Sequence, residues 1–464
     1  MPHSTQSGAS AGRRAILTGG EVVALLVVLM AVLKLVAVWF FVPAARTTFD
    51  LGFGFDPYVR SLVAGRGYVS CGSGSCDVAS RMPGLPLFLA ALAPLTTSLR
   101  IVDAIKVLLL SLLVYLAVRG IDRRLAVRHC WQVGIYIALG LFLVLSPNLI
   151  KHASAAYYEE GYVLELLAIT AVCLFFVAVA PREASAGRYV AAIAAASVCY
   201  LFKSSLILVW GAVALLIVVF ALTSGRRALA AGLVAVALIA PAGWLAHNAI
   251  ESHRLSFMSS TDGENMYRGW NTYTLVLYPH CSLDMLFDPV TTCEGEAITS
   301  PHEPGRAGFK TEWAWNDAYK TRATEWIRQN PGAALKTFAV KAYEVLLSPQ
   351  LVPYRNYVPA PDGSHLIELP RSRGEADVGS LWLALGRLIE IFAFGASLYL
   401  LIRGDSAARR VALASLALGV CYATPYILGF GYERHFSILI MLAALSSLFL
   451  VSALVRLSGA KAAA

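Results

Sequence analysis

The sequence predicts an all-α polytopic membrane protein, and three observations lead to this fold class. Of the 464 residues, 58% are hydrophobic and only 14% are charged, whereas a soluble domain carries about 25% charged residues. About ten runs are apolar enough to cross a bilayer as helices, which need about 20 residues each. Lys and Arg lie mainly in short loops between these runs. The composition excludes a water-soluble enzyme, a disordered chain and a small disulfide scaffold.

The predicted spans form two groups, separated by a long and more polar segment. They are 21–42, 101–118, 131–146, 160–180, 189–202, 205–222, 228–245, 380–402, 410–430 and 435–455. The first run is longer than the apolar core of a cleaved signal peptide, so we expect it to remain as a membrane anchor.

The spans divide the chain into membrane modules, two long loops and two tails. The expected parts are a tail at 1–20, an N-terminal transmembrane module at 21–245 with a first long loop at 43–100, a second long loop at 246–379, C-terminal transmembrane helices at 380–456 and a tail at 457–464. Within the second loop, 334–350 alternates apolar and charged residues at near-helical spacing. It is too polar for a span, and we predict a helix lying in the membrane interface. Residues 351–374 are expected to form a connecting loop.

The basic residues predict the orientation of the chain. Arg residues occupy alternate short loops, at 119–128, 182–188, 226–227 and 403–410. Such loops stay in the cytoplasm, so both tails are expected there and both long loops outside, in a multi-pass protein of a cell membrane. The net charge of +9 is thus a topology signal. Nucleic acid is not an expected partner, because no basic patch is interleaved with aromatic residues.

The cysteines of the two long loops form two close pairs, Cys71 with Cys76 and Cys281 with Cys293. Outside the cytoplasm such pairs predict disulfides, and free thiols are the alternative. No Cys or His spacing is typical of a zinc site. We therefore expect no metal and no other cofactor.

Two carboxylates follow the first span, Asp50 and Asp56. An acidic side chain at the mouth of a helix bundle can act as general base toward a bound hydroxyl group. The alternative for Asp56 is a helix cap, because it precedes Pro57 as a capping residue precedes a proline in the first turn.

Three cations are candidates for binding an anionic group near the outer boundary. Arg81 begins the apolar stretch 79–94, which is predicted to lie in the interface as a helix. Lys203 lies between two spans, and Arg434 begins the last one, where its guanidinium can hold a phosphate through two hydrogen bonds. For Arg81 and Lys203 the alternative is that the long side chain only extends its charged end to the membrane surface and binds no ligand. For the segment around Arg434 the alternative is a structural ion pair between Glu433 and a neighbouring residue.

Glu159 and Glu160 lie where the fourth predicted span begins. Adjacent residues do not share one face of a helix, so at most one of the two carboxylates is expected to point into a cavity. A solvated pair of carboxylates is the alternative.

Several short motifs of the two long loops resemble the GT-C superfamily of polytopic glycosyltransferases. The resemblance is to the branch similar to protein O-mannosyltransferases and lipid A aminoarabinose transferases. In the first loop it is carried by Asp56-Pro57-Tyr58, Gly65-Arg66-Gly67-Tyr68 and Arg81-Met82-Pro83-Gly84-Leu85-Pro86. In the second loop it is carried by Gly263, Asn265, Tyr267, Gly269 and Asn271.

The resemblance implies an inverting enzyme that moves one sugar from a polyprenyl-phosphate donor to an acceptor hydroxyl of a glycan, lipid or protein. Asp56 would be the base, although the family often has Glu where this chain has Pro57, and Asp50 is the alternative. Glu159 or Glu160 would orient the acceptor or assist the base. The donor phosphate would be held by Arg81, Lys203 and Arg434, and the pocket would include Tyr58, Asn265 and Tyr267.

Two other classes of membrane protein remain as alternatives. A transporter or flippase usually has inverted repeats with broken spans in matching halves, and this sequence lacks that symmetry. A polymerase or ligase of lipid-linked glycans would share the donor and the topology, and it would differ by transferring chains of sugars.

Overall fold

The computed structural model describes residues 19–51, 54–71, 76–118, 130–146, 149–150, 152–153, 158–279, 281, 283–287, 292–293, 296–297, 303–349, 356–359, 366–369 and 373–462. Within these residues the chain is an all-α polytopic membrane protein whose only sheets are three two-stranded hairpins. The fold class predicted from the sequence is confirmed. The tails predicted before residue 19 and after residue 462 lie outside the described part.

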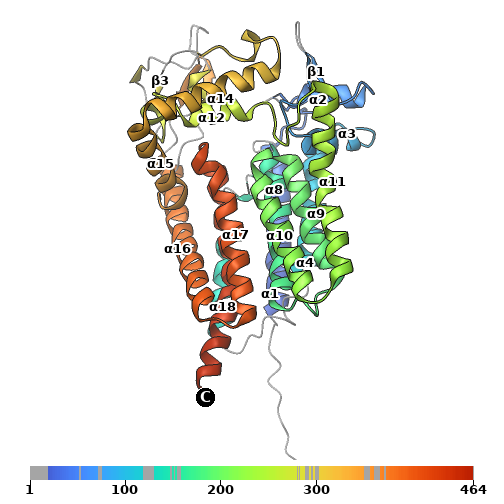
Figure 1. Cartoon of the computed structure of the whole chain (residues 1–464), viewed down its shortest axis with the longest axis vertical. Coiled ribbons are helices and arrows are strands. Elements are labelled where there is room, and N and C mark those ends of the chain that lie inside the picture. The colour runs from blue at the N-terminus through green and yellow to red at the C-terminus, as the bar shows by residue number, and fades with distance from the viewer. Residues whose placement is uncertain are drawn as a thin grey trace, which may run out of the picture.

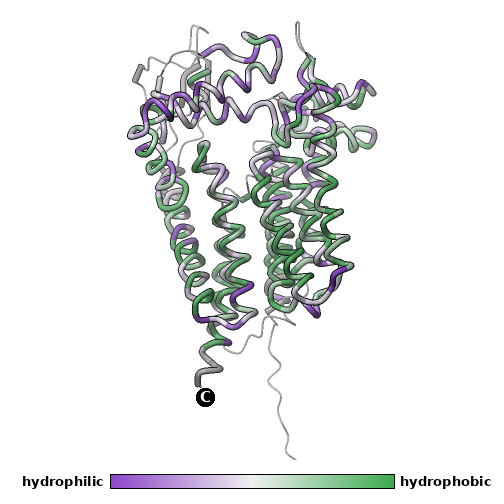
Figure 2. Tube along the Cα trace, viewed as in Figure 1, coloured by the Kyte–Doolittle hydropathy of each residue, from purple (hydrophilic) through white to green (hydrophobic). Residues whose placement is uncertain are grey.

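Eight of the described helices are long and apolar enough to cross a membrane. They are α1 (Gly19–Phe41), α4 (Leu99–Val118), α8 (Tyr158–Val179), α10 (Ile207–Thr223), α11 (Arg227–Ser252), α16 (Arg373–Arg403), α17 (Ser406–Leu428) and α18 (Glu433–Ala462). Two shorter apolar helices, α6 (Cys130–Val144) and α9 (Ala186–Phe202), complete the bundle. Each of these helices overlaps one predicted run, and Figure 2 shows hydrophobic residues along their length.

Local sequence explains why these segments are helical. Inside a bilayer every backbone polar group needs an internal partner, and a helix supplies one within the segment itself. At the start of α17 the side chain of Asp405 accepts a hydrogen bond from the Ala408 N–H at 2.7 Å, which satisfies one of the free donors of the first turn. Pro57 occupies the first turn of α2 (Asp56–Val63), where its missing N–H costs nothing.

Helix α8 is the centre of the bundle. Of its membrane-spanning stretch, 94% is buried, and it packs against α4, α9, α17 and α18. The side chains of α8 therefore face protein on all sides, and polar groups on it need protein partners.

One end of the bundle carries a layer of short elements, which we call the loop layer (Figure 1). From the first long loop come α2, β1 (Ser70–Cys71), β2 (Cys76–Asp77) and α3 (Gly84–Leu92). From the second come α12 (Asp262–Gly269), α13 (Thr274–Leu277), η3 (Leu283–Leu286), β3 (Thr292–Cys293), β4 (Glu296–Ala297), η4 (Arg306–Gly308), α14 (Glu312–Gln329), α15 (Pro331–Leu346), β5 (Asn356–Pro359) and β6 (Leu366–Leu369). A further short helix, η2 (Ser204–Leu206), joins α9 to α10.

Basic residues gather at the opposite end of the bundle. Arg226 donates a hydrogen bond to the carbonyl of Ala184 at 2.7 Å, and Arg410 donates one to the carbonyl of Ala178 at 2.8 Å. Segments that are distant in sequence are thus joined at this end, away from the loop layer.

Some element boundaries differ from those expected. Helix α16 begins at Arg373, about two turns before the predicted span, because its first turns are polar and hydropathy does not detect them. Hairpin β5–β6 occupies part of the predicted connecting loop 351–374, since two strands of four residues each do not stand out in a segment rich in Pro, Arg and Gly. Helix α3 begins three residues after Arg81. Helix α15 covers most of the predicted interfacial segment, and its exposed Leu335 and Phe338 give it the apolar surface that such a helix needs.

Candidate active-site cavity

A cavity of about 650 Å³ lies where the membrane helices meet the loop layer. Its walls come from the first turns of α8, α10 and α18, the last turns of α9 and α17, helix α12, and the loop before α3. Its charged lining side chains are Arg81, Glu159, Glu160, Lys203, Asp262, Arg268 and Arg434. Segments that are far apart in sequence thus contribute both signs of charge to one cavity.

Glu160, in the first turn of α8, binds the cationic groups of two other elements. Its Oε1 lies 2.6 Å from Lys203 Nζ and 3.2 Å from Arg434 Nε. Glu159 lies 3.9 Å from the same lysine. The Glu160 side chain is buried, so these charge-assisted contacts hold the two cations at the cavity wall.

His435 supports this cluster with its imidazole ring. The Tyr432 backbone N–H donates to His435 Nδ1 at 3.0 Å, and Nε2 lies 3.3 Å from Lys203 Nζ. Nε2 lies 3.5 Å from the Glu160 carboxylate. The ring also stacks on Tyr426, with centroids 4.2 Å apart. These contacts fix the orientation of the ring.

The third cation of the cavity, Arg81, contacts an aromatic ring, whereas Lys203 and Arg434 contact Glu160. Its guanidinium lies over the Phe55 ring at 5.2 Å from the centroid, and among the described residues no carboxylate lies within ion-pair distance of it. Its backbone carbonyl accepts a hydrogen bond from the Tyr68 hydroxyl at 2.9 Å. The side chain is therefore positioned in the cavity wall with its charge available to an anionic ligand.

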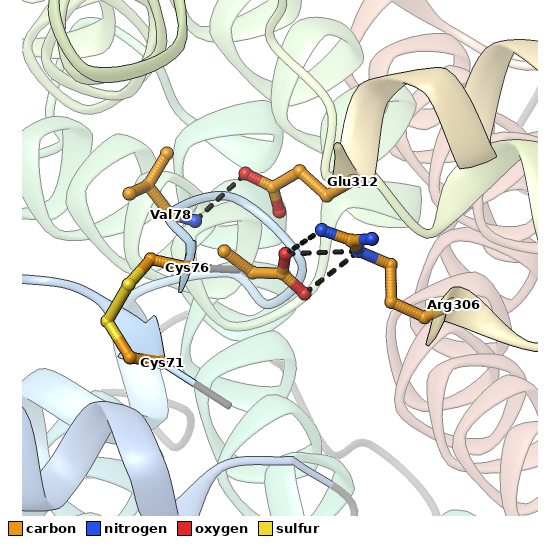
Figure 3. Close-up of a disulfide and its surroundings, with 6 residues drawn as sticks. Cys71, Cys76, Val78, Arg306 and Glu312 are labelled. Carbon is orange, nitrogen blue, oxygen red and sulfur yellow. Dashed lines mark hydrogen bonds and ion pairs between the residues drawn. A yellow bond between two sulfur atoms is a disulfide. The ribbon is translucent and has the colours of Figure 1, made fainter. Parts of the chain in front are cut away.

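The loop that carries Arg81 is fixed by contacts between the two long loops (Figure 3). Arg306 donates to both carboxylate oxygens of Asp77, at 3.0 and 3.2 Å from its Nε. Next to this pair, the Glu312 carboxylate accepts the Val78 N–H at 2.8 Å. The disulfide Cys71–Cys76 joins β1 to β2, the strand that also contains Asp77. We call the contacts of Glu312 and Arg306 with residues 77–79 the loop latch.

Helix α12 forms the wall nearest the loop layer. Asp262 begins this helix, and its Oδ1 accepts a hydrogen bond from the Ser204 hydroxyl at 3.0 Å. Burial raises the pKa of Asp262 to about 6. Gly263 allows the helix to rest on α14, because a Cβ there would lie 2.0 Å from the carbonyl oxygen of Asn316.

Most of the predicted site residues line this cavity. They are Arg81, Glu159, Glu160, Lys203, Asn265 and Arg434. Two others lie behind the wall. The Tyr58 hydroxyl is 2.8 Å from the hydroxyl of Ser80, which does line the cavity. The Tyr267 hydroxyl donates to Glu303 at 2.7 Å.

The two candidate bases of the first loop are not among the lining residues of the cavity. Asp56 accepts a hydrogen bond from the Leu51 N–H at 2.6 Å. Asp50 is exposed, and a hydrogen bond from the Thr47 hydroxyl lowers the pKa of its carboxyl group. The described geometry gives Asp56 a local contact and leaves Asp50 in solvent.

Sequence reasoning did not assign roles to Asp262, Arg268 or Trp270, all of which line the cavity. The available signal was their position inside the second-loop segment that carries the resemblance. Asp262 has no distinctive spacing in the sequence, so only its contact with Ser204 in the structure identifies it as a candidate site residue.

The predicted disulfide between Cys71 and Cys76 is confirmed. Cys281 is also disulfide-bonded, and the side chain of its predicted partner, Cys293, lies outside the described part. Among the described residues no group of three His, Cys, Asp or Glu side chains is arranged to hold a metal ion.

The fold and the cavity define an integral membrane protein with a charged chamber at one end of a helical bundle. Comparisons with known protein families, with curated proteins and with solved structures found no match to this chain. The cavity is therefore the part of the molecule from which a function can be inferred.

Proposed function

We propose that the protein is an inverting glycosyltransferase of the membrane. It moves a single sugar from a polyprenyl-phosphate donor to an acceptor hydroxyl on a glycan, lipid or protein. The observation that supports this best is the convergence of Arg81, Lys203 and Arg434 on one cavity that also holds carboxylates. Sugar transfer from a lipid phosphate needs cations for the departing phosphate and a base for the acceptor.

The cations suit a phosphate because ammonium and guanidinium groups form charge-assisted hydrogen bonds with phosphate oxygens. Contacts with Glu160 hold two of them, Lys203 and Arg434, at the cavity wall. Arg81 adds a charge with no carboxylate partner among the described residues. A phosphate between the three would neutralise charge as the sugar–phosphate bond breaks, so no proton donor to the leaving group is required.

The position of the cavity suits a lipid-linked donor. Leu208 of α10 and Leu428 of α17 both line the cavity and are 42% and 49% exposed. Both belong to helices that are long and apolar enough to cross a membrane. An isoprenoid chain can leave the cavity past these residues into the bilayer while its phosphate stays at the cations.

The charge distribution supports an extracytoplasmic cavity. Arg-rich loops occupy the end of the bundle opposite the loop layer, and such loops face the cytoplasm. The disulfide Cys71–Cys76 lies in the loop layer, which agrees with an oxidising compartment. We therefore propose a multi-pass protein of the plasma membrane with both termini in the cytoplasm.

The test is sugar transfer by the purified protein in lipid nanodiscs, with a panel of labelled polyprenyl-phosphate sugars and mixed acceptors. We expect release of polyprenyl phosphate and a product that carries one added sugar. Lys203→Ala and Arg434→Ala should each lower the transfer rate about tenfold or more, because each removes a charge-assisted contact worth about 1.5–3 kcal/mol.

The matched control is Lys336→Ala, which removes an exposed lysine of α15 and should transfer at the wild-type rate. A ladder of products would instead indicate a glycan polymerase or ligase. If the folded wild-type protein consumes none of the donors, the proposal of a transferase is refuted.

A further inference from the structure

Asp262 is an acidic side chain of the cavity that the sequence motifs did not single out. We propose that Asp262 is the general base that removes the proton from the acceptor hydroxyl. This inference rests on the proposed transferase function. It assigns the role to α12 of the second long loop, whereas the resemblance assigns it to Asp56 of the first.

The two oxygens of the Asp262 carboxylate have different surroundings. Oδ1 accepts the hydroxyl hydrogen of Ser204 at 3.0 Å, which fixes the orientation of the group. Oδ2 is covered by its neighbours and has no hydrogen-bond partner among the described residues. Asp262 lines the cavity, so a rotation of the side chain brings this oxygen to a bound hydroxyl, whose proton it can then accept.

The carboxylates that line the cavity differ in their neighbouring charges. Glu160 contacts the cationic groups of Lys203 and Arg434, and neighbouring positive charge stabilises the ionised form of a carboxylate and weakens it as a base. Glu159 also has Lys203 as its nearest cation, at 3.9 Å. Asp262 has no ion pair among the described residues.

The electrostatic surroundings of Asp262 agree with this role. Burial raises the pKa of its carboxyl group to about 6, and hydrogen bonds from Ser204 and Ser259 partly offset this effect. The nearby titratable groups are Lys320 of α14, which lowers the pKa, and Tyr200 of α9. A base with a pKa close to the working pH combines an ionised fraction with a useful proton affinity.

The places of Asp262 and of the cations in the cavity indicate how the bonds and the proton rearrange in the reaction. Ser204, which holds the carboxylate, directly follows Lys203, so base and phosphate site lie along one wall of the cavity. The acceptor oxygen forms a bond to the anomeric carbon as its proton passes to Asp262 Oδ2. The bond from that carbon to the phosphate oxygen breaks, and its electron pair leaves with polyprenyl phosphate. Attack from the face opposite the phosphate inverts the configuration.

The first test compares Asp262→Asn with Asp56→Asn in the transfer assay. Asp262→Asn keeps the size of the side chain and an oxygen for Ser204, and it should lower the turnover rate by about 10²- to 10⁴-fold, as expected for loss of a general base. Donor binding, measured as donor-induced thermal stabilisation, should stay as in the wild type. Glu325→Gln, on the exposed face of α14, is the control.

The second test separates loss of a base from loss of structure. Azide attacks without giving up a proton, so sodium azide should restore donor consumption by Asp262→Ala, with a glycosyl azide of inverted configuration as product. It should not restore consumption by Lys203→Ala, which lacks part of the phosphate site.

Ser204→Ala keeps the carboxylate and removes a hydrogen bond that lowers its pKa, so the acidic limb of the pH–rate profile should move to higher pH.

Two results would overturn the assignment. One is wild-type turnover by Asp262→Asn, above all if Asp56→Asn is inactive. The other is an unmoved acidic limb in Ser204→Ala, a variant that remains informative if the Asp262 variants do not fold. Both results require that the wild-type protein transfers sugar, so they differ from failure of the proposed function, in which the wild type itself is inactive.

Discussion

Glu312 joins the two long loops behind the cavity, and its replacement by alanine tests how far the cavity depends on the loop latch. The carboxylate accepts hydrogen bonds from the backbone N–H groups of Val78 and Ala79, at 2.8 and 3.0 Å, and from the Ser260 hydroxyl at 2.7 Å. Val78 and Ala79 lead directly to Ser80 and Arg81 in the cavity wall. Glu312→Ala removes all three acceptor contacts at once.

The expected loss of stability follows from the burial of these groups. Only 3% of the Glu312 residue is exposed. Each buried donor left without a partner costs about 1–3 kcal/mol, so three donors imply a loss of about 3–6 kcal/mol after partial rearrangement. Glu312→Gln keeps one acceptor oxygen and should lose less.

The assay is thermal unfolding of the purified protein in lipid nanodiscs, followed by donor binding. Glu312→Ala should unfold several degrees below the wild type and bind the donor more weakly, because Arg81 loses its fixed position. The control is Glu325→Ala, an exposed residue of the same helix. If Glu312→Ala and Glu325→Ala unfold at the same temperature, the latch does not hold the loops together.

Two further predictions concern buried charge. Lys34 of α1 and Glu165 of α8 form a buried ion pair, so Glu165→Gln should destabilise the protein by about 3–5 kcal/mol, whereas Lys34→Met combined with Glu165→Leu should cost less, because no charge is left unpaired. Thermal unfolding of the variants checks this order, and a larger loss in the double variant would contradict it. Because burial raises the pKa of Asp262 to about 6, its carboxylate becomes protonated as the pH falls through that value, and the transfer rate should fall with it. A profile that stays flat from about pH 8 down to pH 5 would argue against Asp262 as the base.

Much of the fold was predictable from the sequence because hydropathy is a local property. A run of apolar side chains is driven into the bilayer and must be helical there, whatever its neighbours are. The sequence also predicted the disulfide Cys71–Cys76, since a short separation in an oxidising loop favours closure. The early start of α16 was not predictable in this way, because its polar first turns give no hydropathy signal. The hairpin β5–β6 was not predictable either, because its four-residue strands are too short to span a membrane and pair only in the folded chain.

For the candidate site, the sequence by itself determined which charged residues begin or end the apolar segments. Arg81, Lys203 and Arg434 were identified in this way, since ionisable groups at membrane boundaries are costly and usually have a role. Only the tertiary structure decided their partners. Glu160 meets Lys203 across 43 positions of sequence, and Ser204 meets Asp262 across 58. The same packing put Asp262 in the cavity wall and left Asp56 out of it. The chemistry of a carboxylate depends on the charges and donors within a few ångströms of it, and the packing of distant segments sets those distances.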